Sequence, residues 1–433
     1  MNIPQTNLPR IVIVGGGFAG LNLARSLRGK SVQVVLIDKH NYHTFQPLLY
    51  QVATAGLEPD SIAYPFRKIF KHQKRFYFRM GEVESIDSAS RTVHTSIGDL
   101  SYDYLVLATG SRTNFFGMNE VERHAMSMKE IPEALDIRSL MLQNFEAALL
   151  SDQLNERDGL MSVIIVGGGP TGTELAGALA ELKRHILPKD YPDLDVRRMS
   201  INVVEAAPRV LAAMSEDASK EALEFLENMG VDVWLDKRVK SFDGHQAVCH
   251  DGTVIQGNTL IWAAGVQGNP VLGIPEEHIV AGQRVTVDAF GRFGEREFAI
   301  GDVANLVNED WPKGHPMLAQ VAIQQGKLLA QNLERYIAGK DMKPFSYRDL
   351  GSMATVGRNK AVVDLPRFRF QGAGAWFIWM FIHVIQLIGF RNKLVVTLNW
   401  MYNYFRYARD IRLIIRPYRK SVEDEEFVDV TSR

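Results

Sequence analysis

The stretch IVIVGGGFAG, residues 11–20, decides the fold. Four apolar, β-forming residues run into three glycines, and Gly15, Gly17 and Gly20 fit the pattern G-x-G-x-x-G. A helical pattern follows, and then a second strand-like run that ends at Asp38. Glycine lets the backbone approach a pyrophosphate, the helix N-terminus offers free N–H groups, and the acid accepts hydrogen bonds from a ribose. The stretch therefore predicts a Rossmann-like dinucleotide-binding unit.

The same unit recurs in the second half of the chain. Gly167, Gly169 and Gly172 repeat the glycine pattern as GGGPTG, again directly after a strand-like run. Glu205 ends the next strand-like run, as Asp38 does in the first unit. A polar, proline-containing insertion makes the second spacing longer than the usual figure of about 20 residues. Two nucleotide-binding domains of one plan, and hence an α/β fold, are predicted.

Each unit continues into three more strand-like runs, which we expect to form a small antiparallel ribbon. In the first half the last run ends in Ala108, Thr109 and Gly110. In the second half the matching run ends in Ala264 and Gly265. Small residues there let the backbone approach a ligand. The runs are 76–86, 92–96 and 104–108, mirrored by 231–235, 247–250 and 259–264.

Composition limits the classes of function. The chain has 433 residues, which suggests two or three domains, and a net charge of −1, which gives no bulk attraction to nucleic acid. Cys249 is the only cysteine, so a disulfide relay or a cysteine-ligated cluster within the chain is excluded, and we expect no metal site. The N-terminus shows no signal or transit pattern, so we expect the binding fold to start inside the cell.

The C-terminal region raises the question of a membrane. Residues 373–390 form an uncharged run in which Trp376, Trp379, His383 and Gln386 recur at helical spacing. Tryptophan and histidine prefer the headgroup level of a bilayer to its hydrocarbon core. This stripe therefore favours a helix that lies in the interface over one that spans the membrane.

The following segment, 394–412, is amphipathic and basic. Eight Lys or Arg and one Asp lie between positions 391 and 420, which predicts binding of residues 373–420 to an anionic membrane surface. A helical hairpin packed on the protein's own core and a dimer interface are the alternatives. The apolar face holds Leu398, Met401, Phe405 and Ala408, and the polar face holds Asn399, Asn403, Arg406 and Asp410.

Two dinucleotide sites in one chain imply electron transfer between a tightly held flavin and a diffusing nicotinamide cofactor. At these residues the sequence resembles the two-dinucleotide-binding flavoprotein reductases, and among them the type II NADH dehydrogenases, the single-subunit NADH:quinone oxidoreductases. The likeness covers nearly the whole chain except the acidic tail. Its motifs are NYHTFQPLLYQVAT at 41–54, GGGPTGTELAG at 167–177, VVEAAPRVL at 203–211, WAAGV at 262–266, Gly301-Asp302, and AQVAIQQG at 319–326.

The resemblance implies an FAD-binding domain interrupted by an NADH-binding domain, and then a C-terminal amphipathic, helical membrane-binding region. The expected bounds are 8–113 and 285–333 for the FAD domain, 114–284 for the NADH domain, 334–420 for the membrane region, and 421–433 for an acidic tail that we expect to be disordered.

In the first unit the resemblance implies non-covalent FAD. The backbone at Gly15, Gly17 and Gly20 would hold its pyrophosphate. Asp38 would bind the adenosine ribose, and Asp302 the ribityl chain or the flavin phosphate region. The remaining FAD contacts implied are Ala108, Thr109, Gly110 and Gln320.

In the second unit the resemblance implies NADH as the co-substrate, with its pyrophosphate on Gly167, Gly169 and Gly172. Glu205 would bind the adenosine ribose, and because a carboxylate repels a 2′-phosphate, NADH should be preferred to NADPH. Glu174 would reach the nicotinamide–flavin contact, although a helix-dipole partner is an equal alternative. Ala264 and Gly265 complete the implied NADH contacts.

The resemblance also implies a quinone site. Gln320 and Gln324 would share a helical face beneath the flavin, where an amide can hydrogen-bond a quinone carbonyl. A surface or flavin-packing role is the alternative, above all for Gln324. Together with Glu174, these two glutamines are the candidate catalytic residues, and the role of Lys360 stays open. Gln46, Pro47 and Leu48 would line the quinone tunnel.

The function implied is transfer of a hydride from NADH to FAD and then two-electron reduction of a membrane quinone, without proton pumping. The enzyme would lie peripherally on the cytoplasmic face of the cell membrane. A soluble NADH-dependent ferredoxin or rubredoxin reductase of the same fold is the main alternative. A sulfide:quinone oxidoreductase would need paired cysteines, and an NADH-sensing flavoprotein would show little turnover. The sequence leaves the oligomeric state open, with a homodimer as one option.

Overall fold

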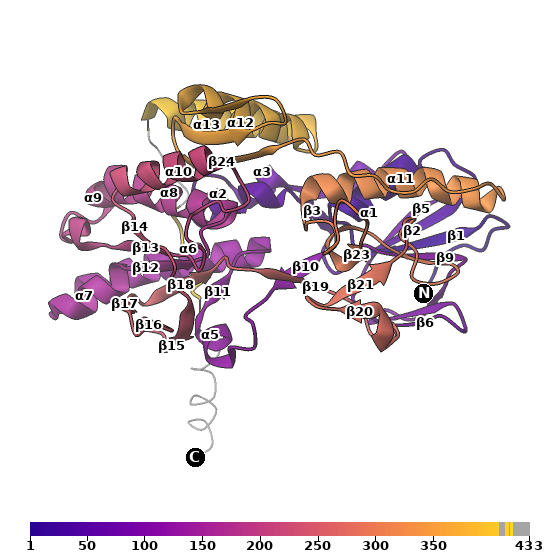
Figure 1. The fold of residues 1–433 in the computed structure, drawn as a ribbon, viewed down its shortest axis with the longest axis horizontal. Helices are drawn as coiled ribbons and strands as arrows, with labels where there is room; N and C mark the ends of the chain where they lie inside the picture. The colour runs from indigo at the N-terminus through magenta and orange to yellow at the C-terminus, as the bar shows by residue number, and fades with distance from the viewer. Residues whose placement is uncertain (407–411, 415, 419–433) are drawn as a thin grey trace, which may run out of the picture. The chain divides into compact units, whose positions relative to one another are not determined.

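The computed structural model describes residues 1–406, 412–414 and 416–418. The chain forms two compact units, each built from three separate segments (Figure 1). Unit 1 holds Met1–Thr44, Ala63–Arg112 and Val266–Leu350, and unit 2 holds Phe45–Ile62, Thr113–Gly265 and the described residues from Gly351 on.

Unit 1 is organised on a five-stranded parallel sheet in the order β22-β9-β1-β2-β5. The run quoted first above forms its central strand, which is buried along its whole length, as is typical of parallel sheets covered on both faces. Helix α11 packs so closely on α1 that a Cβ atom at Gly326 would lie 2.4 Å from the Ala19 carbonyl oxygen. Glycine at this position therefore allows the close approach of the two helices. The bounds are β1 Arg10–Val14, α1 Phe18–Ser26, β2 Gln33–Asp38, β5 Phe76–Met80, β9 Tyr104–Leu107, β22 Glu297–Ala299 and α11 Ala319–Ile337.

Unit 2 repeats this plan with a parallel sheet in the order β11-β18-β12-β13-β14. The strand before the second glycine pattern is again central, and the strand that ends at the acid lies beside it. The predicted α/β fold with two Rossmann-like domains is thus confirmed, while the assigned domain limits stay a prediction. The bounds are β11 Met126–Ser127, β12 Val163–Val166, α8 Pro170–His185, β13 Ile201–Val204, β14 Asp232–Trp234 and β18 Thr259–Trp262.

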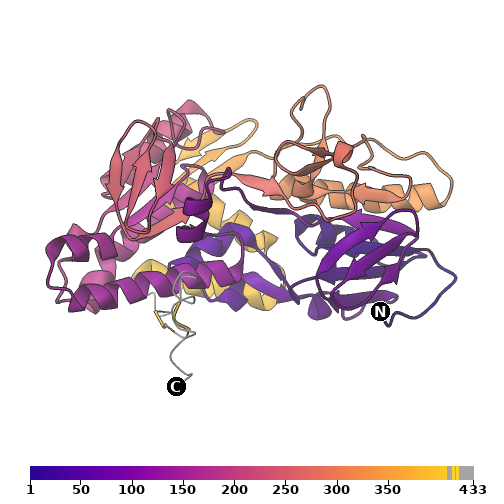
Figure 2. The same cartoon turned by 90° about the horizontal axis from the view of Figure 1, so that it is seen from below.

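The prediction of the antiparallel ribbons is partly wrong. The runs that begin at Phe76 and Val231, and those that end at Ala108 and Ala264, contribute strands of the two parallel sheets. Strands β9 and β18 are buried throughout, so their continuous apolar runs mark central parallel strands. Only the residues between them form ribbons, seen from below in Figure 2. These are β6 Val83–Asp87, β7 Thr92–Thr95 and β8 Leu100–Ser101 in unit 1, and β15 Val239–Phe242, β16 Gln246–Cys249 and β17 Val254–Gln256 in unit 2.

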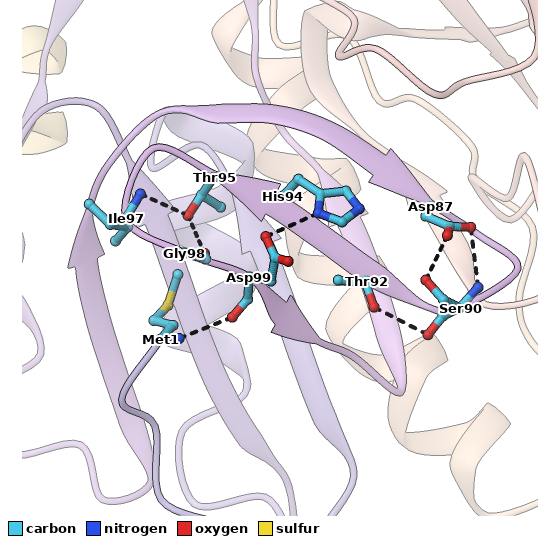
Figure 3. A network of polar contacts seen from close by, with 9 residues as sticks. All are labelled: Met1, Asp87, Ser90, Thr92, His94, Thr95, Ile97, Gly98 and Asp99. Carbon is cyan, nitrogen blue, oxygen red and sulfur yellow. Dashed lines mark hydrogen bonds and ion pairs between the residues drawn. The ribbon is translucent and has the colours of Figure 1, made fainter.

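Local polar contacts fix the turns of the unit 1 ribbon (Figure 3). The Ser90 hydroxyl donates to the Asp87 carboxylate at 2.7 Å, which closes one turn. At the other end, His94 Nδ1 lies 3.0 Å from Asp99 Oδ1, and the N-terminal amine of Met1 donates to the Asp99 carbonyl at 3.1 Å. These contacts are exposed and join residues of the ribbon to one another or to the N-terminus, so they shape the ribbon and leave the ligand-binding edge of the parallel sheet untouched.

The C-terminal region adds a three-stranded sheet and two helices to unit 2 (Figure 1). No helix among the described residues is both long enough and apolar enough to cross a membrane. Ala408, Asp410 and the acidic tail lie outside the described residues. The bounds are β24 Ser352–Gly357, β25 Lys360–Asp364, β26 Arg369–Gln371, α12 Ala373–Gln386 and α13 Phe390–Arg406.

Further helices and strands complete the two units. In unit 1 they are β3 Tyr42–Thr44, β4 Ala63–Pro65, α4 Phe66–Ile69, β19 Val266–Gly268, η3 Glu276–His278, β20 Ile279–Val280, β21 Arg284–Val287, η4 Gly301–Val303 and β23 Ala304–Leu306. In unit 2 they are η1 Gln46–Leu48, α2 Leu49–Ala53, α3 Pro59–Ile62, α5 Asn119–His124, α6 Ile131–Leu150, α7 Leu154–Met161, α9 Leu187–Asp190, η2 Val196–Arg198 and α10 Glu216–Asn228, and β10 Ser111–Thr113 lies where the chain leaves unit 1.

Candidate active site

The first glycine loop in unit 1 has the shape of a pyrophosphate cradle. Gly15 has φ +98°, and a Cβ atom there would lie 2.4 Å from the Ala108 carbonyl oxygen. A Cβ atom at Gly20 would lie 1.9 Å from the Gly15 carbonyl oxygen, so both positions need glycine for the fold itself. A Cβ atom at Gly17, by contrast, would meet no protein atom within 4 Å. Gly17 therefore faces open space at the N-terminus of α1, where a pyrophosphate could approach the backbone, and its assignment to FAD stays a prediction.

The acid at the end of β2 lies against this loop. Asp38 Oδ2 accepts a hydrogen bond from the Gly16 N–H at 2.6 Å, and Oδ1 accepts one from the His40 N–H at 2.8 Å. Burial raises the pKa of Asp38, and the two backbone N–H groups oppose that rise. The predicted ribose-binding carboxylate is thus held at the strand end that a dinucleotide crosses.

The other residues assigned to FAD meet at the same carboxyl edge of the unit 1 sheet. Asp302, which follows β22, accepts a hydrogen bond from the Ser111 hydroxyl at 2.6 Å. The Thr109 hydroxyl donates to the Asn269 carbonyl at 2.6 Å. The sequence interpretation missed Gln325, whose buried side-chain oxygen accepts from the Gly301 N–H at 2.7 Å. That bond connects helix α11 to the Gly301-Asp302 pair. The sequence pointed to it only through the position of Gln325, directly after Gln324 in the AQVAIQQG motif.

The second glycine loop, in unit 2, has the same geometry. Gly167 has φ +111°, and a Cβ atom there would lie 2.8 Å from the Ala263 carbonyl. A Cβ atom at Gly172 would lie 1.9 Å from the Gly167 carbonyl oxygen, while one at Gly169 would meet nothing within 4 Å. The structure thus offers a second open cradle at the N-terminus of α8, with the small residues after β18 beside it.

Glu205 holds the position in unit 2 that Asp38 holds in unit 1. Its carboxylate accepts hydrogen bonds from the Gly168 N–H at 2.5 Å and from the Ala207 N–H at 2.7 Å. The guanidinium of Arg209 donates to the carbonyls of Met214 and Ala212, so it is engaged by its own loop. The nucleotide edge therefore presents a carboxylate, which would repel a 2′-phosphate.

Replacing Glu205 by glutamine should weaken the preference for NADH. Glu205→Gln keeps the size of the side chain and removes the charge that opposes a 2′-phosphate. We expect the ratio of kcat/KM for NADH to that for NADPH to fall by about tenfold or more, measured as steady-state oxidation of each cofactor. Glu224→Gln, on the exposed face of α10 in the same unit, is the matched control. An unchanged ratio in Glu205→Gln would remove this residue from cofactor selection.

Glu174 lies on α8 one turn beyond the second cradle and is buried. Its carboxyl oxygen accepts a hydrogen bond from the Thr355 N–H of β24 at 3.4 Å. Burial raises the pKa of Glu174 to about 8, and the Thr355 N–H and the Trp379 indole N–H oppose that rise. Trp379 Nε1 itself makes no hydrogen bond of normal geometry among the described residues. At neutral pH Glu174 is therefore a protonated acid facing the C-terminal region, and its contact with NADH stays a prediction.

A cavity of about 100 Å³ lies beside Glu174, between α8 and the C-terminal helices of unit 2. Its wall is mostly apolar and aromatic, with amides and charged groups at a few positions. Such a mixture is typical of a pocket for an amphipathic ring compound or for ordered water. The main aromatic lining residues are Tyr50, Trp376, Trp379, Trp400 and Tyr404.

The interpretation of the aromatic stripe on α12 is wrong for Trp379. Its side chain is only 1% exposed and stacks on the His383 ring with centroids 4.0 Å apart. His383 Nδ1 hydrogen-bonds to the Trp379 carbonyl at 2.7 Å, so the ring has a partner within its own helix. Trp379 and His383 thus turn inward, Trp376 is half-buried and Gln386 is exposed, while the outward face of α12 is mainly apolar.

The residues assigned to quinone are distributed over both units. In unit 1, Gln324 uses both ends of its amide on the backbone of Arg348, at 2.8 and 3.0 Å, and Gln320 accepts from the Leu350 N–H at 3.1 Å. This arrangement favours the structural alternative for Gln324. In unit 2, Gln46 is exposed and donates to the Lys129 carbonyl at 3.3 Å. Gln46 begins the short helix η1, Pro47 follows it there, and Leu48 in the same helix is fully buried. The quinone contacts of all five residues stay predictions.

Comparison with known proteins identifies the family. Residues 9–326 match the family described as pyridine nucleotide-disulphide oxidoreductase, and residues 350–410 match the NDH2 C-terminal domain. The chain is 34% identical over 421 residues to the type II NADH:quinone oxidoreductase Ndh of Mycobacterium tuberculosis, covering 92% of this chain and 89% of that protein. The chain belongs to the type II NADH:quinone oxidoreductases.

This type II NADH:quinone oxidoreductase has the fold of its solved relatives. NDH2 from Plasmodium falciparum, solved in complex with NADH, superposes with a TM-score of 0.86 at 21% identity, covering 95% of this chain and 100% of that one. A sulfide:quinone oxidoreductase from Aquifex aeolicus also shares the fold, with a TM-score of 0.69 at 18% identity. The predicted FAD-dependent oxidation of NADH by a quinone is confirmed, as are FAD and NADH as the nucleotides.

Proposed function

We propose that this enzyme works as a peripheral protein on the cytoplasmic face of the cell membrane, where it reduces a membrane quinone with electrons from NADH. The observation that supports this most directly is the exposed apolar face of α12 and α13. Both helices belong to the unit that also holds the second cradle and Glu174. The same unit would therefore meet the lipid phase and bind the electron donor.

The two cradles divide the work between the nucleotides. Unit 1 holds FAD through the loop around Gly17 and through Asp38, and unit 2 holds NADH through the loop around Gly169 and through Glu205. When bound, the flavin supplies the two-electron chemistry that accepts a hydride from NADH and reduces the quinone. The chain itself contributes alignment and electrostatics.

Glu174 is a buried carboxyl group that can supply a proton to the quinone half-reaction. Reduction of a quinone to a quinol consumes two protons, and a carboxyl with a pKa of about 8 holds one at neutral pH. The carboxyl lies beside a cavity that reaches the aromatic side chains of α12 and α13. We assign to Glu174 the role of holding a proton for the quinone half-reaction.

The membrane face is built from apolar side chains with unusually high exposure. Phe381 of α12 is 66% exposed and Phe405 of α13 is 75% exposed, although both lie on well-formed helices. A contiguous apolar surface of this kind marks an interaction with lipid or protein. Part of the basic charge that was predicted to meet the membrane is paired inside unit 2, at Arg391–Asp60, Arg412–Asp190 and Arg416–Asp136. Other exposed members of the face are Phe377, Ile378, Ile385, Phe390, Leu394, Leu398 and Met401.

Charged substitutions on this face should release the enzyme from lipid. We expect Phe381→Asp combined with Phe405→Asp to reduce co-sedimentation with phosphatidylglycerol-containing vesicles by about tenfold or more, because each change places a charge where an aromatic ring would enter the bilayer. NADH oxidation with a water-soluble quinone analogue should stay near the wild-type rate.

Leu150→Asp is the matched control for the double variant. Leu150 is 86% exposed at the end of α6 in the same unit, away from α12 and α13. It should bind vesicles as the wild type does. Equal vesicle binding by the double variant and the wild type would refute the proposed membrane face. Loss of binding in Leu150→Asp as well would show a general effect of added charge.

A further inference from the structure

The two glycine loops hold their middle peptide in different ways. In unit 1 the Gly16 carbonyl oxygen lies 2.9 Å from Nδ1 of His43, a buried side chain on β3. Because a carbonyl oxygen can only accept, His43 Nδ1 carries the hydrogen and donates it. In unit 2 the equivalent Gly168 carbonyl accepts from the backbone N–H of Leu211, at 2.8 Å. The loop assigned to FAD thus depends on a side chain where the loop assigned to NADH uses the main chain.

The backbone of Gly16 is held from three directions. Its N–H donates to Asp38 at 2.6 Å and its carbonyl accepts from His43. A Cβ atom at Gly16 would lie 2.2 Å from the Phe66 ring, so the third side is closed by packing. Asp38 and the Phe66 ring cannot replace a donor to the carbonyl. Without His43, the Gly16–Gly17 peptide would lose the one hydrogen bond that its carbonyl oxygen accepts among the described residues.

The surroundings of His43 keep it a neutral donor of fixed orientation. Burial lowers its pKa to about 4, and the bond to Gly16 only partly opposes that shift. Strand β3 pairs with β4 at His43, and the Phe18 ring meets the imidazole edge-on with centroids 5.2 Å apart. Phe18 is the first residue of α1, so the imidazole lies at the helix N-terminus that faces the pyrophosphate. A neutral ring adds no charge at the helix N-terminus, so the contribution of His43 is to hold the loop in its geometry.

We propose that His43 is a positioning residue for FAD, whose Nδ1–H holds the carbonyl of the Gly16–Gly17 peptide so that the glycine loop has its pyrophosphate-binding shape before the flavin arrives. This rests on the assignment of the first cradle to FAD. A loop that already has its binding shape loses less conformational entropy when FAD binds, which favours tight binding of the cofactor. This role of His43 also predicts that one substitution weakens FAD binding and leaves NADH binding in unit 2 unchanged.

The test compares two substitutions of nearly the same shape. Asparagine and leucine both branch at Cγ and leave a similar void, but only asparagine has a donor near the position of Nδ1. We expect His43→Leu to weaken FAD binding to the apoprotein by about tenfold or more, and His43→Asn to stay within about threefold of the wild type. The readouts are the FAD dissociation constant and the FAD content after gel filtration. The NADH dissociation constant should be unchanged in both variants.

His94→Leu and His94→Asn are the controls, because His94 is a half-buried histidine of the unit 1 ribbon, away from the glycine loop, and bonds to Asp99 (Figure 3). They should retain FAD like the wild type. Equal FAD binding by His43→Leu and the wild type would overturn the proposal. Equal losses in His43→Asn and His43→Leu would also overturn it, because packing would then explain both. In either case the wild type would still contain FAD, so the family function would stand.

A measurement on the unmodified chain covers the case in which His43→Leu does not fold. Hydrogen exchange of the wild-type apoprotein should show the amides of residues 11–20 protected nearly as well as in the FAD-bound protein. A loop that exchanges freely until FAD binds would contradict preorganisation and overturn the proposal.

Discussion

Gly17→Ala is expected to give a folded protein that has lost FAD. The new methyl group would meet no protein atom within 4 Å, and Gly17 has φ −65°, which alanine adopts without strain. The methyl group would instead occupy the open space at the N-terminus of α1, where the pyrophosphate must approach the backbone. We expect FAD content after gel filtration to fall by about tenfold or more, with the unfolding temperature of the apoprotein within a few degrees of the wild type.

Gly169→Ala is the matched variant in the other cradle. Gly169 has φ −72° and the same open space around its Cα atom. It should retain FAD and raise the KM for NADH by about tenfold or more. The crossed pattern is the informative result, because each variant tests one loop and controls for the other. If Gly17→Ala kept its FAD, or if both variants lost FAD alike, the assignment of the loops to the two nucleotides would be wrong.

Glu174→Gln should have the largest effect on the quinone half-reaction. Glutamine has nearly the size of the acid and can hydrogen-bond to the Thr355 N–H, but it cannot release a proton. General acid catalysis is typically worth about 10²–10⁴ in rate, so we expect the rate of quinone reduction to fall by about a hundredfold. Reduction of the bound flavin by NADH, followed by stopped flow, should stay within about threefold of the wild type. Equal quinone rates in the two proteins would exclude Glu174 as a proton source.

The pH dependence gives an independent check on Glu174. In the wild type the quinone rate should fall as the pH rises through about 8, because the carboxyl loses its proton there. Between pH 4.5 and 8 the folded protein keeps this proton while the unfolded chain releases it, so the free energy of unfolding falls as the pH rises. The fall is at most about 1.4 kcal/mol per pH unit. Glu174→Gln should flatten both profiles in that range.

The sequence alone predicted the parts of the fold that rest on short-range pattern. The glycine loops, the acids at the strand ends and the small residues after β9 and β18 lie where the spacing places them, because a strand–turn–helix unit has one geometry. The long insertion in the second unit does not displace Glu205, since the insertion lies between α8 and β13 and leaves the end of β13 beside the second glycine loop.

What the sequence could not predict depends on contacts between distant segments. Trp379 faces Glu174 because α12 packs on β24 and β24 packs on α8, a helix from a distant part of the sequence. Helical periodicity alone does not say which face of α12 turns inward. Gln325 was passed over because its partner, the Gly301 N–H, is defined only by the approach of α11 to η4. Nothing in the sequence pairs His43 with a partner, and the structure shows that its ring bonds to the glycine loop at the Gly16 carbonyl.

Anaerobic titration of the purified enzyme tests the central claim most directly. One equivalent of NADH should bleach the absorbance of the bound flavin, and one equivalent of a quinone analogue should restore it. The same amount of NADPH should bleach the flavin far more slowly, because Glu205 opposes a 2′-phosphate. A flavin that NADH bleaches but that no quinone reoxidises, or a protein purified without flavin, would contradict the assignment of this chain as an FAD-dependent NADH:quinone oxidoreductase.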